Sequence, residues 1–572
     1  MFDQTLAPVA NSLTLSALIA LLPLLTVFVM LGGLRTKAHI AGLTGLAVAI
    51  LVAILAFGMP TKLALLSATE GGVFGLFPIM WIVFNALWVY QLTVVSGRFE
   101  DLRASFSLIS DDPRIMAVLI AFCFGGLLEA LAGFGAPVAI TGVMLMALGF
   151  SPFKAATVVL LANTAPVAYG AIATPILTAG TLTGIPYEEI GAIVGRQTPL
   201  LALFVPLVLV GMVDGKRGIR QTWPAALVCG VTFAIAQFVS SNYISVELTD
   251  IIASLVALGA TIAFLKVWQP TGTAEANAAL AQDARQEEEN NPTGGSAGQI
   301  KDPAHDRGGA GSTKVGTPAP TRELTGSRIG MALLPYIVII VVFSIARLVP
   351  SIKSAIAGTD QKIPWPGLDG QIVGTSGKPI TSTIYNFQWL SSPGTLLLIC
   401  GVLVMLIYKI GPATAVREYF ATAYKLRFAF LTVASVLALA YVMNQSGQTI
   451  TIGNWIAATG AFFAFLSPIL GWLGTAVTGS DTSANALFST LQQTAAREAG
   501  INETLLVAAN TSGGVVGKMI SPQNLTIAAT AVGIVGREGE LFRYLIRWSV
   551  GLILVICVLV YLQSTPVLGW ML

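Results

Sequence analysis

Apolar runs of about 18 or more residues recur along nearly the whole chain, and such runs are typical of helices that cross a bilayer. The clearest runs are 13–31, 39–57, 72–92, 223–239, 251–267, 329–348, 395–410 and 541–562. Only 10% of the 572 residues are charged, whereas a soluble domain carries roughly a quarter. The sequence therefore predicts an all-α polytopic membrane protein.

The chain lacks the common motifs of enzymes and cofactor sites. Its four cysteines lie inside apolar runs, without CxxC or other metal-ligand spacing. It contains no HExxH zinc motif and no GxxxxGK[ST] phosphate loop. We therefore expect no enzymatic activity, no bound metal or cofactor and no nucleic-acid partner.

Basic residues indicate the topology, because they favour the cytoplasmic side of a membrane. Clusters of Lys and Arg predict cytoplasmic loops near 98–114, 214–220, 409–427 and 537–547. The segment 350–392 has few basic residues and many turn formers, which predicts an ordered extracytoplasmic loop.

Residues 268–326 differ from the rest of the chain, since they are rich in Gly, Ser, Pro, Glu and Asn. Such a composition buries too little apolar surface to fold alone. We expect a disordered cytoplasmic linker that divides the chain into two halves.

The two halves contain related motifs. Residues 163–175 read NTAPVAYGAIATP, and 510–522 read NTSGGVVGKMISP, at a constant offset of 347 residues. Upstream, EALAGFGAPVA and TAVTGSDTSAN align Gly133 with Gly479 at an offset of 346 residues. Two matches in the same order indicate an internal repeat.

The flanking charges place both ends of the stretch around Gly133 inside and both ends of the stretch around Gly479 outside. Each stretch is too short for two crossings, which need about 40 residues plus a turn. We therefore expect re-entrant hairpins at 115–150 and 461–495 that enter from opposite faces, as in inverted repeats.

A long helix is predicted after each hairpin, at 152–182 and 501–535. The first would be about 46 Å long, against a hydrocarbon core of about 30 Å. Helix breakers follow Asn-Thr in both: Pro166 in the first, and Gly513 and Gly514 in the second. We expect each helix to be broken there, with the NTxP and NTSG segments unwound.

The predicted organisation alternates scaffold and core segments. The scaffold consists of the N-terminal helices 1–114, the connecting helices 214–267 and the second-half helices 327–460. The cores are 115–213 and 461–562.

Unwound backbone at membrane depth needs polar partners, and secondary transporters use such breaks to build a midplane site. Half-helix N-termini and neutral polar groups there suit a small anion. The predicted substrate-binding residues are Gly133, Phe134, Gly135, Asn163, Thr164, Tyr169, Ser480, Asn510, Thr511, Ser512 and Lys518. For Tyr169, packing is the alternative.

Charged residues in the two cores are the candidates for coupling. Lys518 suits a substrate carboxylate, because a charge at this depth costs about 3 kcal/mol or more and indicates a functional site; a snorkelling or ion-paired lysine is the alternative. Glu129 is either a proton carrier or the structural partner of a basic residue. Asp481 is either a proton carrier or a helix N-cap. Arg196 is expected to pair with Glu129 or with the substrate.

Three segments, LLEALAGFGAPVAI, LANTAPVAYGAIATPI and AANTSGGVVGKMISPQNL, resemble the bacterial L-lactate permease family, and the resemblance covers most of the chain outside the linker. It implies proton-coupled uptake of L-lactate, and often D-lactate or glycolate, across the inner membrane. It also implies the fold of broken-helix, two-hairpin ion transporters, with an elevator-like motion of a core against a scaffold. Such a protein is surrounded by membrane lipid, and a homo-oligomer is left open.

Other functions were weighed against proton symport. A sodium-coupled carboxylate transporter of the same fold is the main alternative, because hydroxyl and carbonyl oxygens at the breaks also suit sodium. A passive anion channel is disfavoured by two occluding hairpins. An intramembrane enzyme is disfavoured because the first half has no aspartate motif to pair with GSD in the second.

Overall fold

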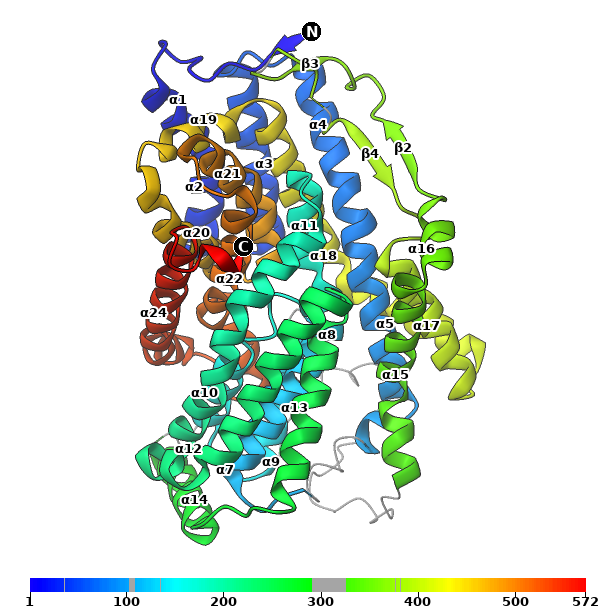
Figure 1. Ribbon diagram of the computed structural model, residues 1–572, viewed down its shortest axis with the longest axis vertical. Helices are drawn as coiled ribbons and strands as arrows, with labels where there is room; N and C mark the ends of the chain where they lie inside the picture. Colours follow the sequence, from blue (N-terminus) through cyan, green and yellow to red (C-terminus); the bar gives the residue numbers. More distant parts are fainter. Residues whose placement is uncertain (35, 102–108, 134, 291–325, 376, 381) are drawn as a thin grey trace.

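The computed structural model describes residues 1–572 apart from 35, 102–108, 134, 291–325, 376 and 381. Helices make up most of the molecule, and the short strands gather at one end (Figure 1). Nine helices in this described part are long and apolar enough to cross a membrane. These are Leu13–Leu31, Ala38–Leu55, Thr61–Val95, Pro113–Leu131, Tyr187–Ile244, Gly326–Ala346, Pro412–Gln445, Gly460–Thr478 and Glu538–Gln563. The predicted polytopic helical class is confirmed.

One group of helices comes from the N-terminal segment and from the segment after the linker. Its first members are α1 (Leu13–Ala20), α2 (Leu22–Phe28), α3 (Ala38–Leu55), α4 (Thr61–Phe74) and α5 (Trp81–Val95). Its later members are α15 (Gly326–Leu348), α16 (Pro350–Ala357), α17 (Pro393–Ile407), α18 (Pro412–Gln445) and α19 (Gln448–Ala457). Helix α18 packs along α3 and α4, and α17 packs on α5, so the two segments form one body.

The short strands pair the N-terminus with the segment 350–392. Strand β1 (Phe2–Asp3) runs parallel to β3 (Ile372–Val373), and β2 (Gln361–Pro364) runs antiparallel to β4 (Ile384–Phe387). The Tyr385 hydroxyl donates to the Phe77 carbonyl at 2.7 Å. This bond ties the loop to the π-helical turn Gly75–Met80 between α4 and α5.

A hairpin of helices opens the first core. Its ascending arm is continuous through α7 (Pro113–Ala117), the π-helical segment Val118–Phe124 and α8 (Gly125–Ala132). Gly133 and Gly135 at the tip have positive φ angles of 43° and 83°, which residues with a Cβ rarely adopt. The descending arm is α9 (Ala136–Ala147).

The next helix of the first core is interrupted. Helix α10 (Pro152–Ala162) and α11 (Gly170–Thr183) are separated by Asn163–Tyr169. A left-handed turn follows, with φ angles of 45°, 57° and 56° at Ala171, Ile172 and Ala173. Such a turn costs about 1–2 kcal/mol per residue, so the surrounding packing must impose it.

Two further elements complete this part of the chain. Helix α12 (Tyr187–Val239) consists of two helices that reverse at Asp214 and Gly215. It is followed by the π-helical turn Ser240–Ile244 and by α13 (Thr249–Leu265), which packs against α12 and α8.

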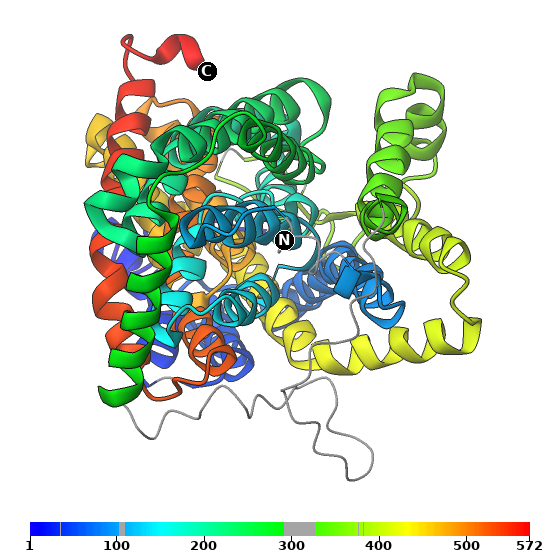
Figure 2. The same ribbon diagram turned by 90° about the horizontal axis from the view of Figure 1, so that it is seen from below.

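The second core begins after α19 with a short 3-10 turn (Gly460–Phe462). Its helices are α20 (Phe463–Thr478), α21 (Asp481–Ala499), α22 (Glu503–Gly517), α23 (Pro522–Ala531) and α24 (Glu538–Gln563), with a final 3-10 turn at Gly569–Met571. Helices α7 and α9 lie toward the lower end of the molecule in Figure 1, whereas α19 and α21 lie toward the upper end beside the strands. Seen from below, α24 and α15 occupy opposite sides (Figure 2).

The predicted unwinding of the NTSG segment is wrong. Asn510, Thr511, Ser512 and the two following glycines all belong to α22. The interruption comes later, as a 3-10 turn over Lys518–Ile520 followed by extended Ser521, whose hydroxyl caps α23 by accepting from the Asn524 N–H. Lys518 therefore lies at the break itself, and not beyond it.

The glycines of NTSGGVVG serve close packing of α22 on α20. A Cβ on Gly513 would lie 1.9 Å from the Pro468 carbonyl oxygen, and one on Gly471 would lie 1.9 Å from the Asn510 carbonyl oxygen. Both distances are far below contact distance, so only glycine fits. Close approach through small residues is a common way for membrane helices to pack.

The prediction of disorder is wrong for residues 273–290, which form α14 (Thr273–Asn290); residues 291–325 lie outside the described part of the chain. Asp283 of α14 pairs with Lys154, and Glu287 accepts from Arg537 at 2.7 Å. Leu280 is buried against the core. The acidic helix is thus held by Lys154 near the start of α10 and Arg537 just before α24, an arrangement that composition alone does not reveal.

Candidate functional site

A buried ion pair joins the two cores. Lys518 Nζ lies 2.5 Å from Glu129 Oε1, and the two side chains are only 8% and 3% exposed. Glu129 stands on α8, one turn before the hairpin tip, whereas Lys518 begins the 3-10 turn after α22. Loss of one member of such a pair would leave a buried charge without compensation.

The interrupted segment between α10 and α11 also lies against this ion pair. A Cβ on Gly170 would lie 2.8 Å from Glu129 Oε1, and one on Gly133 would lie 3.7 Å from it. The Glu129 carboxyl group therefore rests against the hairpin tip and against the broken segment of the first core. Its second oxygen, Oε2, is buried and has no hydrogen-bond partner among the residues that the structure describes.

A small cavity lies next to the pair. It is lined by Val138, Leu160, Asn163, Lys518, Met519 and Asn524. Asn163 Oδ1 is buried without a partner, and the Asn524 side-chain amide donates to the Lys518 carbonyl oxygen at 3.1 Å. The lining thus combines one cation, two amides and apolar walls, which is the chemistry that a small hydroxylated anion needs, but in this structure it is closed and leaves no room for a water molecule.

Asn524 was not among the predicted residues. The sequence signal is an amide side chain two positions after Pro522, in the first turn of a new helix, where its backbone N–H is capped by Ser521.

The second hairpin tip places a carboxyl group near the same lysine. Asp481 Oδ1 accepts from the Thr475 hydroxyl at 3.3 Å, and its Oδ2 is buried without a partner. A Cβ on Gly514, one turn before Lys518, would lie 1.9 Å from Asp481 Oδ1, so this carboxyl group rests against α22. Ser480, and not Asp481, is the N-cap of α21, since its hydroxyl accepts from the Ser483 N–H at 3.3 Å.

Asn510 and Thr511 do not face the cavity in this structure. Both donate to Asn485 Oδ1 of α21, at 3.1 and 3.0 Å. The Ser512 hydroxyl donates to Gln197 of α12 at 2.6 Å. These predicted substrate ligands therefore hold α22 against its neighbours. Asn485, which the sequence reasoning missed, is the acceptor at the centre of this network.

The predicted pairing of Arg196 with Glu129 is wrong, whereas its pairing with the substrate stays a prediction. Its guanidinium donates to Asn242 Oδ1 at 2.9 Å and to the Met571 carbonyl at 2.6 Å. Tyr169 is fully buried and donates to the Gly191 carbonyl at 2.7 Å. Both side chains thus connect neighbouring segments and do not line the small cavity.

The remaining predicted residues lie at the hairpin tip and at the first break. Thr164 donates to the Leu161 carbonyl within its own turn. Gly135 lies against Ile527 of α23, because a Cβ there would come within 2.3 Å of that side chain. Phe134 lies outside the described residues.

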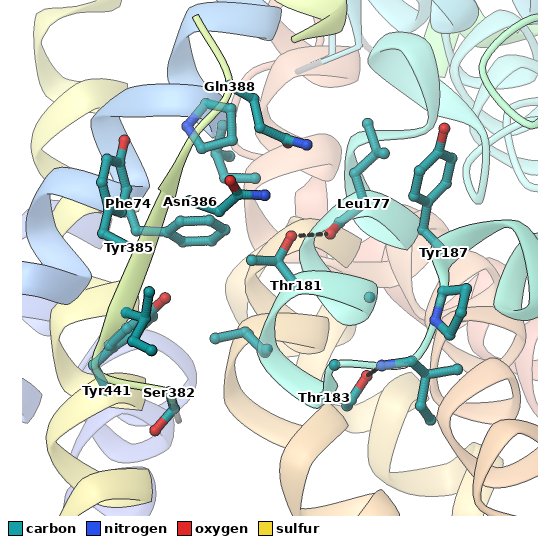
Figure 3. Close-up of a pocket in the computed structure, with 18 of the residues that line it drawn as sticks. Phe74, Leu177, Thr181, Thr183, Tyr187, Ser382, Tyr385, Asn386, Gln388 and Tyr441 are labelled. Carbon is teal, nitrogen blue, oxygen red and sulfur yellow. Dashed lines mark hydrogen bonds between the residues drawn. The ribbon is translucent and has the colours of Figure 1, made fainter. Parts of the chain in front are cut away.

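A larger cavity, of about 500 Å³, lies between the end of α11 and the scaffold (Figure 3). Leu177, Thr181 and Thr183 approach it from α11, and Tyr187 from the start of α12. On the opposite side stand residues of α4, α18 and the strand region: Phe74, Ser382, Tyr385, Asn386, Gln388 and Tyr441 (Figure 3). The ion pair does not line this cavity. We place the site at the ion pair because buried charges and polar atoms without partners gather there.

The cavity has a buried carboxylate beside it. Glu70 of α4 is 1% exposed, and its Oε2 accepts from the Gln445 side chain, which lines the cavity, at 2.8 Å. Sequence reasoning missed Glu70, although a glutamate at 70, at the edge of an apolar run, was a visible signal.

A multi-pass helical protein with a buried ion pair between a hairpin arm and an interrupted helix is typical of membrane transporters, where such charges mark a substrate or ion pathway. Comparison with known proteins makes the assignment more specific. The chain belongs to the L-lactate permease family, whose model matches residues 16–567. It is a multi-pass inner-membrane protein.

Relatives match the chain along its whole length. It is 43% identical to glycolate permease GlcA of Escherichia coli (strain K12) over 97% of this chain and 96% of that protein. It is 41% identical to L-lactate permease of Bacillus subtilis (strain 168), covering 100% and 99%, and 40% identical to L-lactate permease of Escherichia coli (strain K12), covering 100% and 99%.

Solved structures show only distant likeness. The antimetabolite efflux pump MtrF of Neisseria gonorrhoeae matches with a TM-score of 0.41 at 12% identity, over 87% of this chain and 83% of that chain. The YdaH transporter of Alcanivorax borkumensis matches with a TM-score of 0.29 at 13% identity, over 85% and 98%. We draw no argument from these two similarities.

Proposed function

We propose that this protein is a secondary active transporter that takes up L-lactate together with protons, and that D-lactate and glycolate share the same site. The names of its relatives, L-lactate permease and glycolate permease, support this substrate class. The observation that carries the proposed coupling is the buried ion pair between Lys518 and Glu129.

The argument for coupling rests on charge. In the empty site, the lysine cation and the glutamate anion neutralise each other. When Glu129 binds a proton, Lys518 loses its partner and becomes free to bind a carboxylate, so the loaded site is neutral again. A site with only a proton or only an anion carries a net charge, which is costly to move through a low-dielectric interior. Proton and substrate are therefore expected to cross together.

In this structure the small cavity is closed and has no room for a water molecule, so a 2-hydroxy monocarboxylate enters it only when the surrounding helices move apart. The carboxylate would bind Lys518, and the hydroxyl group would reach Asn163, whose side-chain oxygen has no partner in this structure. Val138 and Leu160 provide an apolar wall for the methyl group. Glycolate lacks that methyl group and is accepted by the same polar contacts.

We also propose that the two cores are inverted repeats that move together against the scaffold. Two observations support this proposal. The cavity of about 500 Å³ lies between α11 of the first core and the scaffold. The hairpins α8–α9 and α20–α21 belong to opposite ends of the molecule in Figure 1.

The test compares two transport modes in proteoliposomes. Glu129→Gln mimics the protonated glutamate, so it should still exchange labelled for unlabelled lactate but lose accumulation driven by a proton gradient. Glu540→Gln is the matched control, because Glu540 is 45% exposed in a surface ion pair. Accumulation retained by Glu129→Gln would remove Glu129 from the coupling mechanism.

A further inference from the structure

A second buried carboxylate lies beside the first core. Asp250, in the first turn of α13, is fully buried. Its Oδ1 accepts from the Gln237 side chain at 3.0 Å, whereas its Oδ2 has no hydrogen-bond partner. No ion pair to Asp250 occurs within the described residues. A buried carboxylate with one amide donor and no cation is costly, so the neutral acid is the form that this environment favours.

The next turn of α13 connects Asp250 to the ion pair. Ser254, four residues further along, is buried, and its hydroxyl has no partner. It lies against α8, because a Cβ on Gly126 would come within 2.7 Å of Ser254 Oγ. Gly126 and Glu129 are three residues apart and share one face of α8.

Three buried oxygens on α8 and α13 have no hydrogen-bond partner among the described residues: Glu129 Oε2, Ser254 Oγ and Asp250 Oδ2. They form no hydrogen bonds with one another in this structure, so a proton passes between them only when the side chains rotate or water enters. Gln237 of α12 donates to Asp250, and Glu129 stands on α8, which packs against α13. Neither residue is basic. Buried polar atoms with a purely structural role normally have hydrogen-bond partners. Here one side-chain oxygen each of Glu129, Ser254 and Asp250 has none among the described residues.

Another buried acid, Glu247, lies near Asp250 in the sequence and contacts the wall of the larger cavity. Glu247, three residues before Asp250, accepts from the Tyr187 hydroxyl at 2.9 Å and from the Ser245 hydroxyl at 2.7 Å. Tyr187 lines the cavity of about 500 Å³ (Figure 3). Tyr187 and Glu247 thus connect the cavity wall to the chain just before α13.

We propose that Asp250 is a second proton-binding residue, which passes protons between the cavity side and Glu129 through the Ser254 hydroxyl. The Asp250 proton moves to Ser254 Oγ while the Ser254 proton moves to Glu129 Oε2. This leaves Asp250 ionised, Ser254 neutral and Glu129 protonated. Asp250 then regains a proton by way of Glu247. The inference rests on the proposed proton symport.

The test uses Asp250→Asn in proteoliposomes without sodium. Lactate exchange at equal pH should stay within about twofold of the unmodified protein, and accumulation driven by a proton gradient should fall at least tenfold. Asp283→Asn is the matched surface control, since Asp283 is 43% exposed. Ser254→Ala should slow proton-driven uptake, and Ser254→Thr, which keeps the hydroxyl, should restore it.

Infrared difference spectra give a second readout. Lactate binding should change the carbonyl band of a protonated carboxylic acid, and Asp250→Asn should lose that band. Full proton-driven accumulation in Asp250→Asn would overturn the role of Asp250 and leave the proposed symport intact. Accumulation by the unmodified protein only with sodium would overturn both. If Asp250→Asn does not fold, Asp250→Glu must retain accumulation, and its loss in folded protein would also contradict the relay.

Discussion

Lys518 Nζ lies 2.5 Å from Glu129 Oε1, although 389 residues separate the two in the chain. The first hairpin supplies the glutamate, and the interruption of α22 supplies the lysine. Neither half of the chain forms this ion pair alone, so the pair exists only when the two cores are packed together.

The first prediction concerns this ion pair. Lys518→Met should destabilise the protein by about 3–5 kcal/mol, because the buried Glu129 carboxylate loses its partner. The double variant Lys518→Met/Glu129→Gln should recover most of that loss but should not transport lactate. Thermal unfolding in detergent measures the difference. A double variant no more stable than Lys518→Met would show that the Lys518 and Glu129 side chains do not stabilise each other.

The second prediction concerns helix packing. Gly471→Ala should destabilise the protein by about 1–3 kcal/mol, because the new Cβ would meet the Asn510 carbonyl at 1.9 Å. Gly551→Ala in α24 is the control, since nothing lies within 4 Å of its Cβ. Equal unfolding temperatures for the two variants would contradict the close contact of α20 and α22.

A third prediction tests the buried amide network. Asn485→Ala should cost about 1–3 kcal/mol, because Asn510 and Thr511 each lose their acceptor. Thr181→Ala removes one hydrogen bond at an exposed position and should change stability by less than about 0.5 kcal/mol. Unchanged stability in Asn485→Ala, with lost affinity for lactate, would instead assign this network to the substrate site.

The fourth prediction concerns the pH dependence of stability at Asp112, just before α7. Burial alone would raise the pKa of Asp112, but hydrogen bonds from Arg114 and Thr273 outweigh it and hold the pKa below the ordinary 3.8. A lowered pKa gives stability that is present above pH 3.8 and is lost as the pH falls through the lower value of the folded protein. Asp112→Asn keeps the helix cap and removes the charge.

Asp112→Asn should therefore be less stable than the unmodified protein at pH 7, by about 1.5–3 kcal/mol. The two unfolding temperatures should converge as the pH falls below 3.8. A difference that stays constant across this range would show that the carboxylate charge at Asp112 does not contribute.

The sequence predicts the features that depend on local chemistry. Asn-Thr followed by Pro166 indicates the end of α10, because proline disfavours the helical conformation of the residue before it. Glu129 and Lys518 are recognisable as functional candidates, since charges are rare in apolar segments. Neither signal requires knowledge of what packs nearby.

Tertiary contacts decide the features that the sequence does not reveal. Gly513 and Gly514 look like helix breakers, but the packing of α20 stabilises a helix through them. Arg196 has its partners on α12 and near the C-terminus, and no local pattern identifies them. Helix α14 has a polar composition typical of disorder, yet it docks because Lys154 and Arg537 face its acidic side chains.

The most direct test of the account is uptake of radiolabelled L-lactate into proteoliposomes, without sodium, with and without an inward proton gradient. The account predicts accumulation that requires the gradient, collapses with a protonophore and is lost in Glu129→Gln. Accumulation that appears only after sodium is added, or that persists in Glu129→Gln, would contradict proton coupling through the Lys518–Glu129 pair.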